Sequence, residues 1–129
     1  MRKRLALACL AGSLGAPAAA GAAEQLAAVT ADNQLLLLQS DAPGQVQHAV
    51  ALQGLAPGDR IVGLDERPAT NVLYGLGASS RIYTIQVGSG EARAVGLDPF
   101  GPLLAGSEFG FDFNPTVDRI RVVSDAAQD

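Results

Sequence analysis

The sequence predicts an all-β fold of antiparallel four-stranded repeats of about 47 residues, resembling an incomplete β-propeller. Three observations lead to this prediction. Segments resemble one another at a constant spacing, short apolar runs alternate with turn-forming residues, and no helical pattern of useful length follows the N-terminal segment. A chain of 129 residues holds little more than two such units.

The N-terminal 23 residues have the pattern of a secretory signal peptide. Met1–Arg4 is basic, Leu5–Leu14 is apolar, and Ala16–Ala23 consists almost entirely of small residues. Signal peptidase requires small side chains before its cleavage site, so we expect cleavage before Ala23 or one residue later. The predicted organisation is a signal peptide at residues 1–23 and a repeat domain at residues 24–129. The predicted location is the periplasm or the outside of the cell.

Removal of this peptide changes the charge of the chain. The remaining residues contain six arginines, no lysine and thirteen carboxylates, for a net charge of −7. Such a chain repels nucleic acids and anionic membranes, so neither is an expected partner. Cys9 leaves with the signal peptide, which excludes disulfides and thiolate metal sites from the mature domain.

The repeat is clearest in two segments. Placing Gly63–Gly77 above Gly110–Ser124 aligns a Gly, an Asp and a Pro at an offset of 47 residues. The same offset places Leu26–Leu35 under Leu73–Ile82. These matches predict three partial copies of one unit.

The complete copy contains four predicted strands. Their ranges are Ile61–Asp65, Val72–Leu76, Arg81–Val87 and Ala92–Val95. The segments between them are rich in Gly, Pro, Asn and Ser, the residues that form turns. Four strands in a unit of 40 to 50 residues are typical of a propeller blade.

Two segments resemble the bacterial family called domain of unknown function 4394. One is Gly54–Pro68. The other is Phe109–Asp125, with the sequence Phe-Gly-Phe-Asp-Phe-Asn-Pro-Thr-Val-Asp-Arg-Ile-Arg-Val-Val-Ser-Asp. The resemblance implies an exported, repeat-built β domain of propeller type and no particular reaction. Members of that family continue beyond this motif, so we expect the chain to be truncated at its C-terminus. We also expect residues 24–129 alone to be marginally stable or prone to aggregation.

The densest group of oxygen ligands is Asp112, Asn114 and Asp118, with Asp125 nearby and Asp65 at the repeat position of Asp112. Alternating oxygen ligands suit Ca²⁺, which makes these residues weak candidates for a metal site. The set is incomplete, because it lacks the longer acidic series and the bidentate Glu of a calcium loop.

Turn chemistry is the favoured alternative for the same residues. Side chains of Asp and Asn commonly bond their own backbone, which would hold the turn at Asn114-Pro115. Asp118 would then pair with Arg119 or Arg121, or cap the strand entry. No metal and no cofactor is expected on this interpretation.

Other candidates are weaker. His48 is expected on a strand facing solvent, since no nucleophile motif accompanies it. Gly75–Gly77 and Gly88–Gly90 are interpreted as turns rather than phosphate loops, because neither opens a helix. Arg119 and Arg121 are expected on one face of a strand, where they could hold an anion or neutralise nearby carboxylates.

Two functions stay open. The first is a non-enzymatic module that binds a glycan, a peptide or another envelope protein, and the lack of a catalytic motif favours it. The alternative is a calcium-dependent propeller hydrolase or lactonase whose remaining site residues lie beyond this fragment. The sequence names no catalytic residue for either function.

Overall fold

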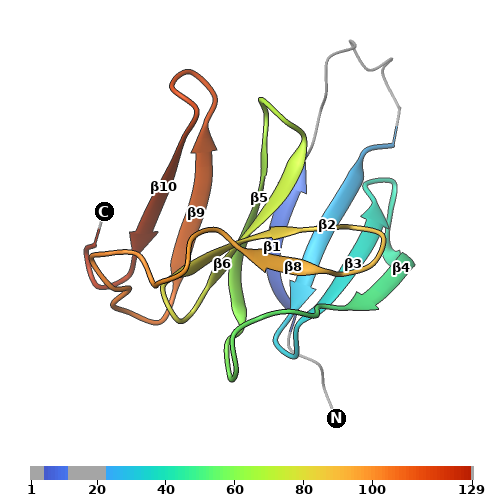
Figure 1. The fold of residues 1–129 in the computed structure, drawn as a ribbon. Coiled ribbons are helices and arrows are strands. Elements are labelled where there is room, and N and C mark those ends of the chain that lie inside the picture. The colour runs from blue at the N-terminus through green and yellow to red at the C-terminus, as the bar shows by residue number, and fades with distance from the viewer. Residues whose placement is uncertain (1–4, 12–22, 129) are drawn as a thin grey trace.

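The computed structural model describes residues 5–11 and 23–128, which form three antiparallel β-sheets and contain no helix (Figure 1). The first sheet consists, in chain order, of β1 (Leu5–Ala11), β2 (Gln25–Thr30), β3 (Gln34–Gln39) and β4 (Ala42–Ala51). The second consists of β5 (Ile61–Arg67), β6 (Val72–Gly77), β7 (Arg81–Ile85) and β8 (Ala92–Ala94), and the third is the hairpin β9 (Phe109–Asn114) and β10 (Arg119–Ser124). The all-β, antiparallel prediction is confirmed. The described sheets do not close into a ring, so the propeller-like arrangement stays a prediction.

The four strands of the second sheet begin where the sequence predicts them, and all four end elsewhere. β6 ends at Gly77, one residue later than predicted, and β8 ends at Ala94, one residue earlier. β5 continues two residues past Asp65, and β7 ends at Ile85 rather than at Val87. β7 ends there because the chain turns. The N–H of Gln86 donates to the carbonyl of Glu91 (2.8 Å), which closes the turn to β8.

The interpretation of Gly75–Gly77 as a turn is wrong, because these residues lie inside β6. Close packing explains the glycines. A Cβ at Gly75 would lie 2.9 Å from a methyl group of Ile85, and one at Gly77 would lie 2.5 Å from a carboxylate oxygen of Asp59. Both positions therefore require glycine for space. Gly88–Gly90, by contrast, lies in the turn after β7 as expected.

Backbone conformations recur along the chain at the interval found in the sequence. Asn33, Ser80 and Ala127 lie 47 residues apart, and all three have positive φ. Each donates its N–H to the carbonyl three residues earlier, which closes the same turn in each sheet. Asn71 and Asp118 form a second such pair, also 47 residues apart and with positive φ. β2, β6 and β10 begin at this interval as well.

The main core lies between the first and second sheets. Its buried members are Ala27, Val29, Leu35 and Leu37 from the first sheet and Ile61, Leu64, Leu73, Tyr83, Ile85 and Ala92 from the second. Burial of apolar surface, as in this cluster, is the dominant stabilising contribution to the folding of a small domain. The first two sheets therefore stack through a continuous apolar layer.

The hairpin β9–β10 packs on the opposite face of the second sheet. Phe113 is buried, and its ring meets Tyr74 edge to face with 5.0 Å between centroids. The N–H of Phe113 donates to the Asp65 carboxylate (2.7 Å), and Arg67 forms an ion pair with Asp118. Gly63 on β5 leaves room for Phe111, so both apolar and polar contacts hold this hairpin in place.

Candidate binding groove on the second sheet

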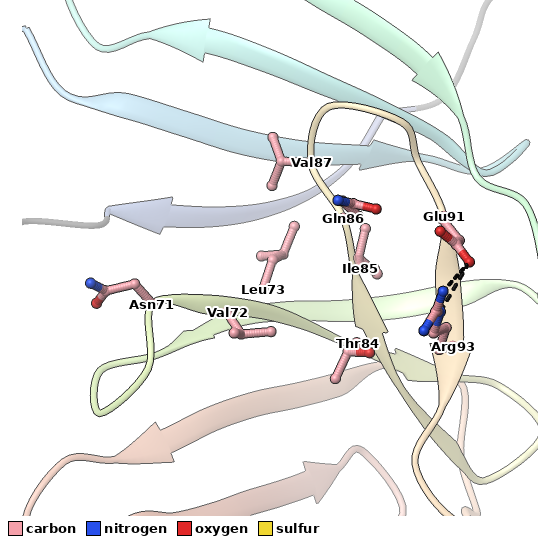
Figure 2. Close-up of a pocket in the computed structure, with 9 residues that line it drawn as sticks. All are labelled: Asn71, Val72, Leu73, Thr84, Ile85, Gln86, Val87, Glu91 and Arg93. Carbon is pink, nitrogen blue, oxygen red and sulfur yellow. Dashed lines mark hydrogen bonds and ion pairs between the residues drawn. The ribbon is translucent and has the colours of Figure 1, made fainter.

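An open groove of about 480 Å³ lies where β6 begins, β7 ends and β8 begins (Figure 2). We call it the β6–β8 groove. Its lining combines aliphatic residues with polar and charged ones. The lining residues are Asn71, Val72, Leu73, Thr84, Ile85, Gln86, Val87, Glu91 and Arg93.

The floor of the groove is apolar because it continues the core. Leu73 and Ile85 are opposite each other on β6 and β7, and both are buried. Val87 packs against the same core from the turn that follows β7. Because side chains alternate along a strand, Thr84 lies on the other face of the sheet from Ile85. Figure 2 shows this alternation.

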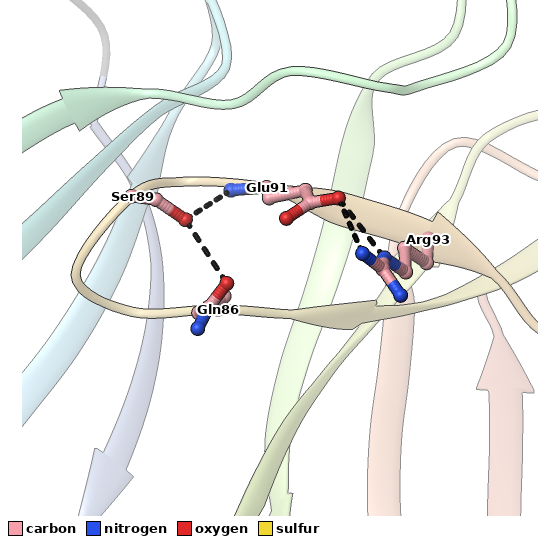
Figure 3. Close-up of polar contacts among 4 residues, drawn as sticks. All are labelled: Gln86, Ser89, Glu91 and Arg93. Carbon is pink, nitrogen blue, oxygen red and sulfur yellow. Dashed lines mark hydrogen bonds and ion pairs between the residues drawn. The ribbon is translucent and has the colours of Figure 1, made fainter.

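The rim of the groove is a hydrogen-bonded turn between β7 and β8 (Figure 3). The hydroxyl of Ser89 donates to the side-chain carbonyl of Gln86 (3.3 Å) and accepts the N–H of Glu91 (3.2 Å). Arg93 then donates from Nε to Oε1 of Glu91 (2.9 Å). One amide, one carboxylate and one guanidinium thus lie along a single edge.

The ion pair at the rim is open to solvent. The side chains of Glu91 and Arg93 are 47% and 76% exposed, so water and salt weaken their attraction. Such a pair can exchange partners at little cost. Together with the amides of Asn71 and Gln86, it offers donors and acceptors to a polar ligand above an apolar floor.

The linker before β5 holds the rim turn in position. The N–H of Gln53 donates to the carbonyl of Gly90 (2.9 Å), and the N–H of Ala92 donates back to Gln53 (2.7 Å). Gly90 has a φ of 75°, and a Cβ there would clash with the carbonyl oxygen of Ala51. Only glycine fits this close approach.

The structure brings together two of the carboxylates singled out in the sequence. Asp65 on β5 faces Asp112 on β9. Partial burial raises the pKa of Asp65, and the negative charge of Asp112 raises it further, against the lowering effect of N–H groups from Phe113 and Glu66. Among the described residues, no three His, Cys, Asp or Glu side chains gather in a way that could hold a metal ion.

The other acidic and amide candidates form local turns, an ion pair and hydrogen bonds to a neighbouring loop. The side-chain oxygen of Asn114 accepts the N–H of Thr116 (2.9 Å), which is the expected local turn. Asp118 forms its ion pair with Arg67 on β5, and not with the neighbouring arginines that the sequence suggested. Asp125 accepts the N–H and hydroxyl of Ser107 (2.8 and 2.7 Å), and these bonds hold the pKa of Asp125 below its usual range.

The basic candidates are not among the residues that line the groove. His48 is exposed on β4, as expected, and its Nε2 lies 3.3 Å from the carbonyl oxygen of Gly88. Arg119 and Arg121 lie two apart on β10 and are both exposed. Arg121 is the cross-strand neighbour of Asp112. The sequence did not point to the β6–β8 groove itself, since its residues come from three strands and a turn.

Sequence reasoning also missed a buried carboxylate, Asp59, in the linker before β5. It is 8% exposed and accepts four hydrogen bonds. The donors are the N–H of Arg60 (2.9 Å), the N–H and hydroxyl of Ser79 (3.0 and 2.6 Å), and the hydroxyl of Tyr83 (2.7 Å). A Pro-Gly-Asp turn before a strand was the available signal, but Ser79 and Tyr83 lie 20 and 24 residues away.

The protonation of this cluster is set by its hydrogen bonds. Burial of Asp59 acts to raise its pKa, but the bonds from Ser79, Tyr83 and Arg60 together lower it below the ordinary value. Burial and the Asp59 carboxylate in turn raise the pKa of Tyr83. No buried side-chain nitrogen or oxygen in the described part of the chain lacks a partner. A fully satisfied, ionised carboxylate of this kind serves as a structural clamp.

Comparison with known proteins gives a family match. The family model described as Domain of unknown function (DUF4394) matches residues 34–129. No curated protein and no solved structure matches the chain. Residues 5–11 and 23–128 contain no helix that could span a membrane. The matched segment covers most of the chain, and the chain therefore belongs to this family of unknown function.

Proposed function

We propose that the chain is an exported, non-enzymatic binding module and that the β6–β8 groove is its ligand site. The observation that supports this proposal most directly is the composition of the groove: an apolar floor below a rim of exposed hydrogen-bonding groups. Ligand sites generally combine these two properties. The groove lining contains no Ser, Cys, His or Lys and only one carboxylate, Glu91, which is paired with Arg93.

The lining favours a short peptide segment over the other ligand classes. Asn71 and Gln86 can each bond a backbone amide, and Glu91 and Arg93 can pair with charged side chains. Glycans commonly stack on aromatic rings, and the groove lining includes none. A peptide side chain of Val or Leu size suits the aliphatic floor.

We also propose that each sheet is one unit of a propeller-like repeat. The recurrence of positive-φ residues at Asn33, Ser80 and Ala127 supports this arrangement, because each residue closes the same turn in its sheet.

The alternative function, a calcium-dependent hydrolase, stays a prediction. Melting the protein with added Ca²⁺ and with a chelator tests it: equal midpoints count against a structural calcium ion.

The groove is tested by NMR titration of the full chain with a library of short peptides. We expect chemical-shift changes to concentrate at Asn71–Leu73 and Gln86–Arg93. The variant Arg93→Ala removes the exposed cation and is expected to weaken binding about tenfold, the effect of losing one charged hydrogen bond. Arg119→Ala, on β10, is the matched control and should bind like the original chain.

Two results would contradict this proposal. One is equal weakening by both arginine variants, which would mean that the peptides respond to overall charge. The other is shift changes confined to a different surface. Loss of the NMR spectrum's dispersion in Arg93→Ala would show unfolding, so the variant Gln86→Ala, in an exposed turn, provides a second measurement.

A further inference from the structure

β1 occupies the place in the first sheet that β5 occupies in the second. Both four-stranded sheets keep the order of the chain, so β1 and β5 are each a first strand at a sheet edge. β1 runs antiparallel to β2, from Leu5 opposite Thr30 to Ala11 opposite Leu26. In Figure 1 it lies between β2 and β5, and it contacts both.

These seven residues belong to the apolar part of the proposed signal peptide, Leu5–Leu14. Cleavage near Ala23 would therefore remove β1 from the exported protein. β2 would keep β3 on one side and would lose its partner on the other. The N–H and C=O groups that β2 directs toward β1 would then lack protein partners.

β2 is poorly suited to be an open edge. Its sequence, Gln25–Thr30, contains no charge and no proline, and Ala28 and Val29 are each 1% exposed when β1 is present. The other sheet edges carry features that discourage strand pairing. These are Pro43 and two register shifts in β4, the short β8 with Arg93, the charged run Asp65–Arg67 in β5, Asp112 in β9, and two arginines in β10.

We propose that, in the exported protein, the free edge of β2 is a strand-binding site whose ligand is an extended apolar segment of another polypeptide. The ligand has the chemistry of Leu5–Ala11: about seven small and aliphatic residues, without charge or proline. It binds antiparallel to β2 and is covered by β5. This mode is strand addition, in which backbone hydrogen bonds provide affinity and alternate side chains provide selectivity. The inference rests on the proposed cleavage of the signal peptide and is independent of the β6–β8 groove.

A second copy of the mature chain is a poorer ligand. Within residues 23–128, β2 to β10 are already paired in sheets. Residues 95–108, the longest stretch outside the strands in that range, contain Pro99 and Pro102, which cannot donate to a strand partner. β10 lies at the edge of its sheet, but it carries Arg119 and Arg121. It therefore differs from β1, the uncharged strand that pairs with β2 in this structure.

The test uses the exported, processed protein and a synthetic peptide of Leu5–Ala11 with lysines added at its ends for solubility. Mass spectrometry first locates the N-terminus. Binding is then followed by fluorescence anisotropy of the labelled peptide and by NMR shifts of β2 amides. Two controls are matched to the site: the peptide with Ala8→Pro, which interrupts strand pairing, and the uncleaved chain, in which β1 already fills the site.

We expect the processed protein to bind the Leu5–Ala11 peptide at least tenfold more tightly than the Ala8→Pro peptide, and the uncleaved chain to bind neither. If the processed protein is unfolded alone, folding upon addition of the first peptide only is the supporting result. Failure of both peptides to bind or induce folding overturns the proposal, as does equal binding of both. Two further results would also overturn the proposal. Self-association through β2 that excludes the peptide would assign the site to a second copy of the chain. An N-terminus that is retained in the exported protein would mean that β1 stays in its own sheet.

Discussion

The second sheet is held on its two faces in different ways. Toward the first sheet it contributes Leu64, Leu73 and Ile85 to a buried apolar layer. Toward the β9–β10 hairpin it contributes one aromatic contact, the close approach of Gly63 to Phe111, a carboxylate that caps a backbone N–H, and an exposed ion pair. The first interface resembles the interior of a single domain, and the second resembles a reversible contact.

This difference predicts two levels of stability within one chain. Apolar burial contributes roughly 25 cal/mol per Å² removed from water, whereas exposed ion pairs contribute little. The stacked first and second sheets should therefore open only in global unfolding. The hairpin should open at lower free energy, as a separate unit.

The largest effect is expected from Leu35→Ala, in the layer between the first two sheets. Leu35 is fully buried, so its truncation leaves a cavity and should cost about 4 kcal/mol of unfolding free energy. Chemical denaturation of the full chain measures this. Leu97→Ala is the control, since Leu97 is 95% exposed and its truncation should change the midpoint very little. Similar losses in both variants would mean that the apolar layer is not the main core.

The next effect is expected from Asp59→Asn, which keeps the size of the side chain and removes its charge. The amide cannot accept all the hydrogen bonds that the carboxylate accepts from Ser79 and Tyr83, so we expect a loss of about 2 kcal/mol at pH 7. Because the pKa of Asp59 is lowered in the folded state, its stabilising contribution is present above its unfolded value of about 3.9 and is lost as the pH falls through the folded value.

The pH dependence of this variant provides its control. Unfolding curves of the original chain and of Asp59→Asn should converge as the pH drops below about 4. A constant difference at every pH would show that the carboxylate acts through shape and not through its charge.

A smaller and more local effect is expected from Phe113→Leu in the hairpin. The substitution removes the edge-to-face contact with Tyr74 while leaving an apolar side chain, at a cost of about 1 kcal/mol. Amide hydrogen exchange should accelerate in β9 and β10 and stay unchanged in β3 and β7. Uniform acceleration across all strands would mean that the hairpin and the two sheets unfold together.

The smallest effect is expected from Asp118→Asn, which removes the ion pair with Arg67. Asparagine tolerates the positive φ of 50° at this position, so the substitution isolates the charge. Both side chains are more than 30% exposed, and the change in thermal midpoint should be close to the limit of detection. Any difference should vanish at about 0.5 M salt, since screening weakens exposed pairs. A large, salt-independent loss would place this pair among the essential contacts.

Much of the fold could be predicted because its determinants are local. Strand position follows from apolar runs between turn residues, and the predicted starts of β5 to β8 agree with the structure. The turn at Asn114 was also predictable, because its hydrogen bond joins residues two apart. Gly75–Gly77 was misassigned because glycine serves both turns and close packing, and the neighbours that decide between them are distant in sequence.

The sequence by itself determined the all-β class, the 47-residue spacing and the family to which the chain belongs. Only the tertiary structure decided the partners of Asp59 and Asp118, which lie 24 and 51 residues away at Tyr83 and Arg67. The same holds for the β6–β8 groove and for the place of β1 beside β2. The physical reason is that strand formation depends on neighbours along the chain, whereas ion pairs, grooves and strand edges depend on how finished sheets stack.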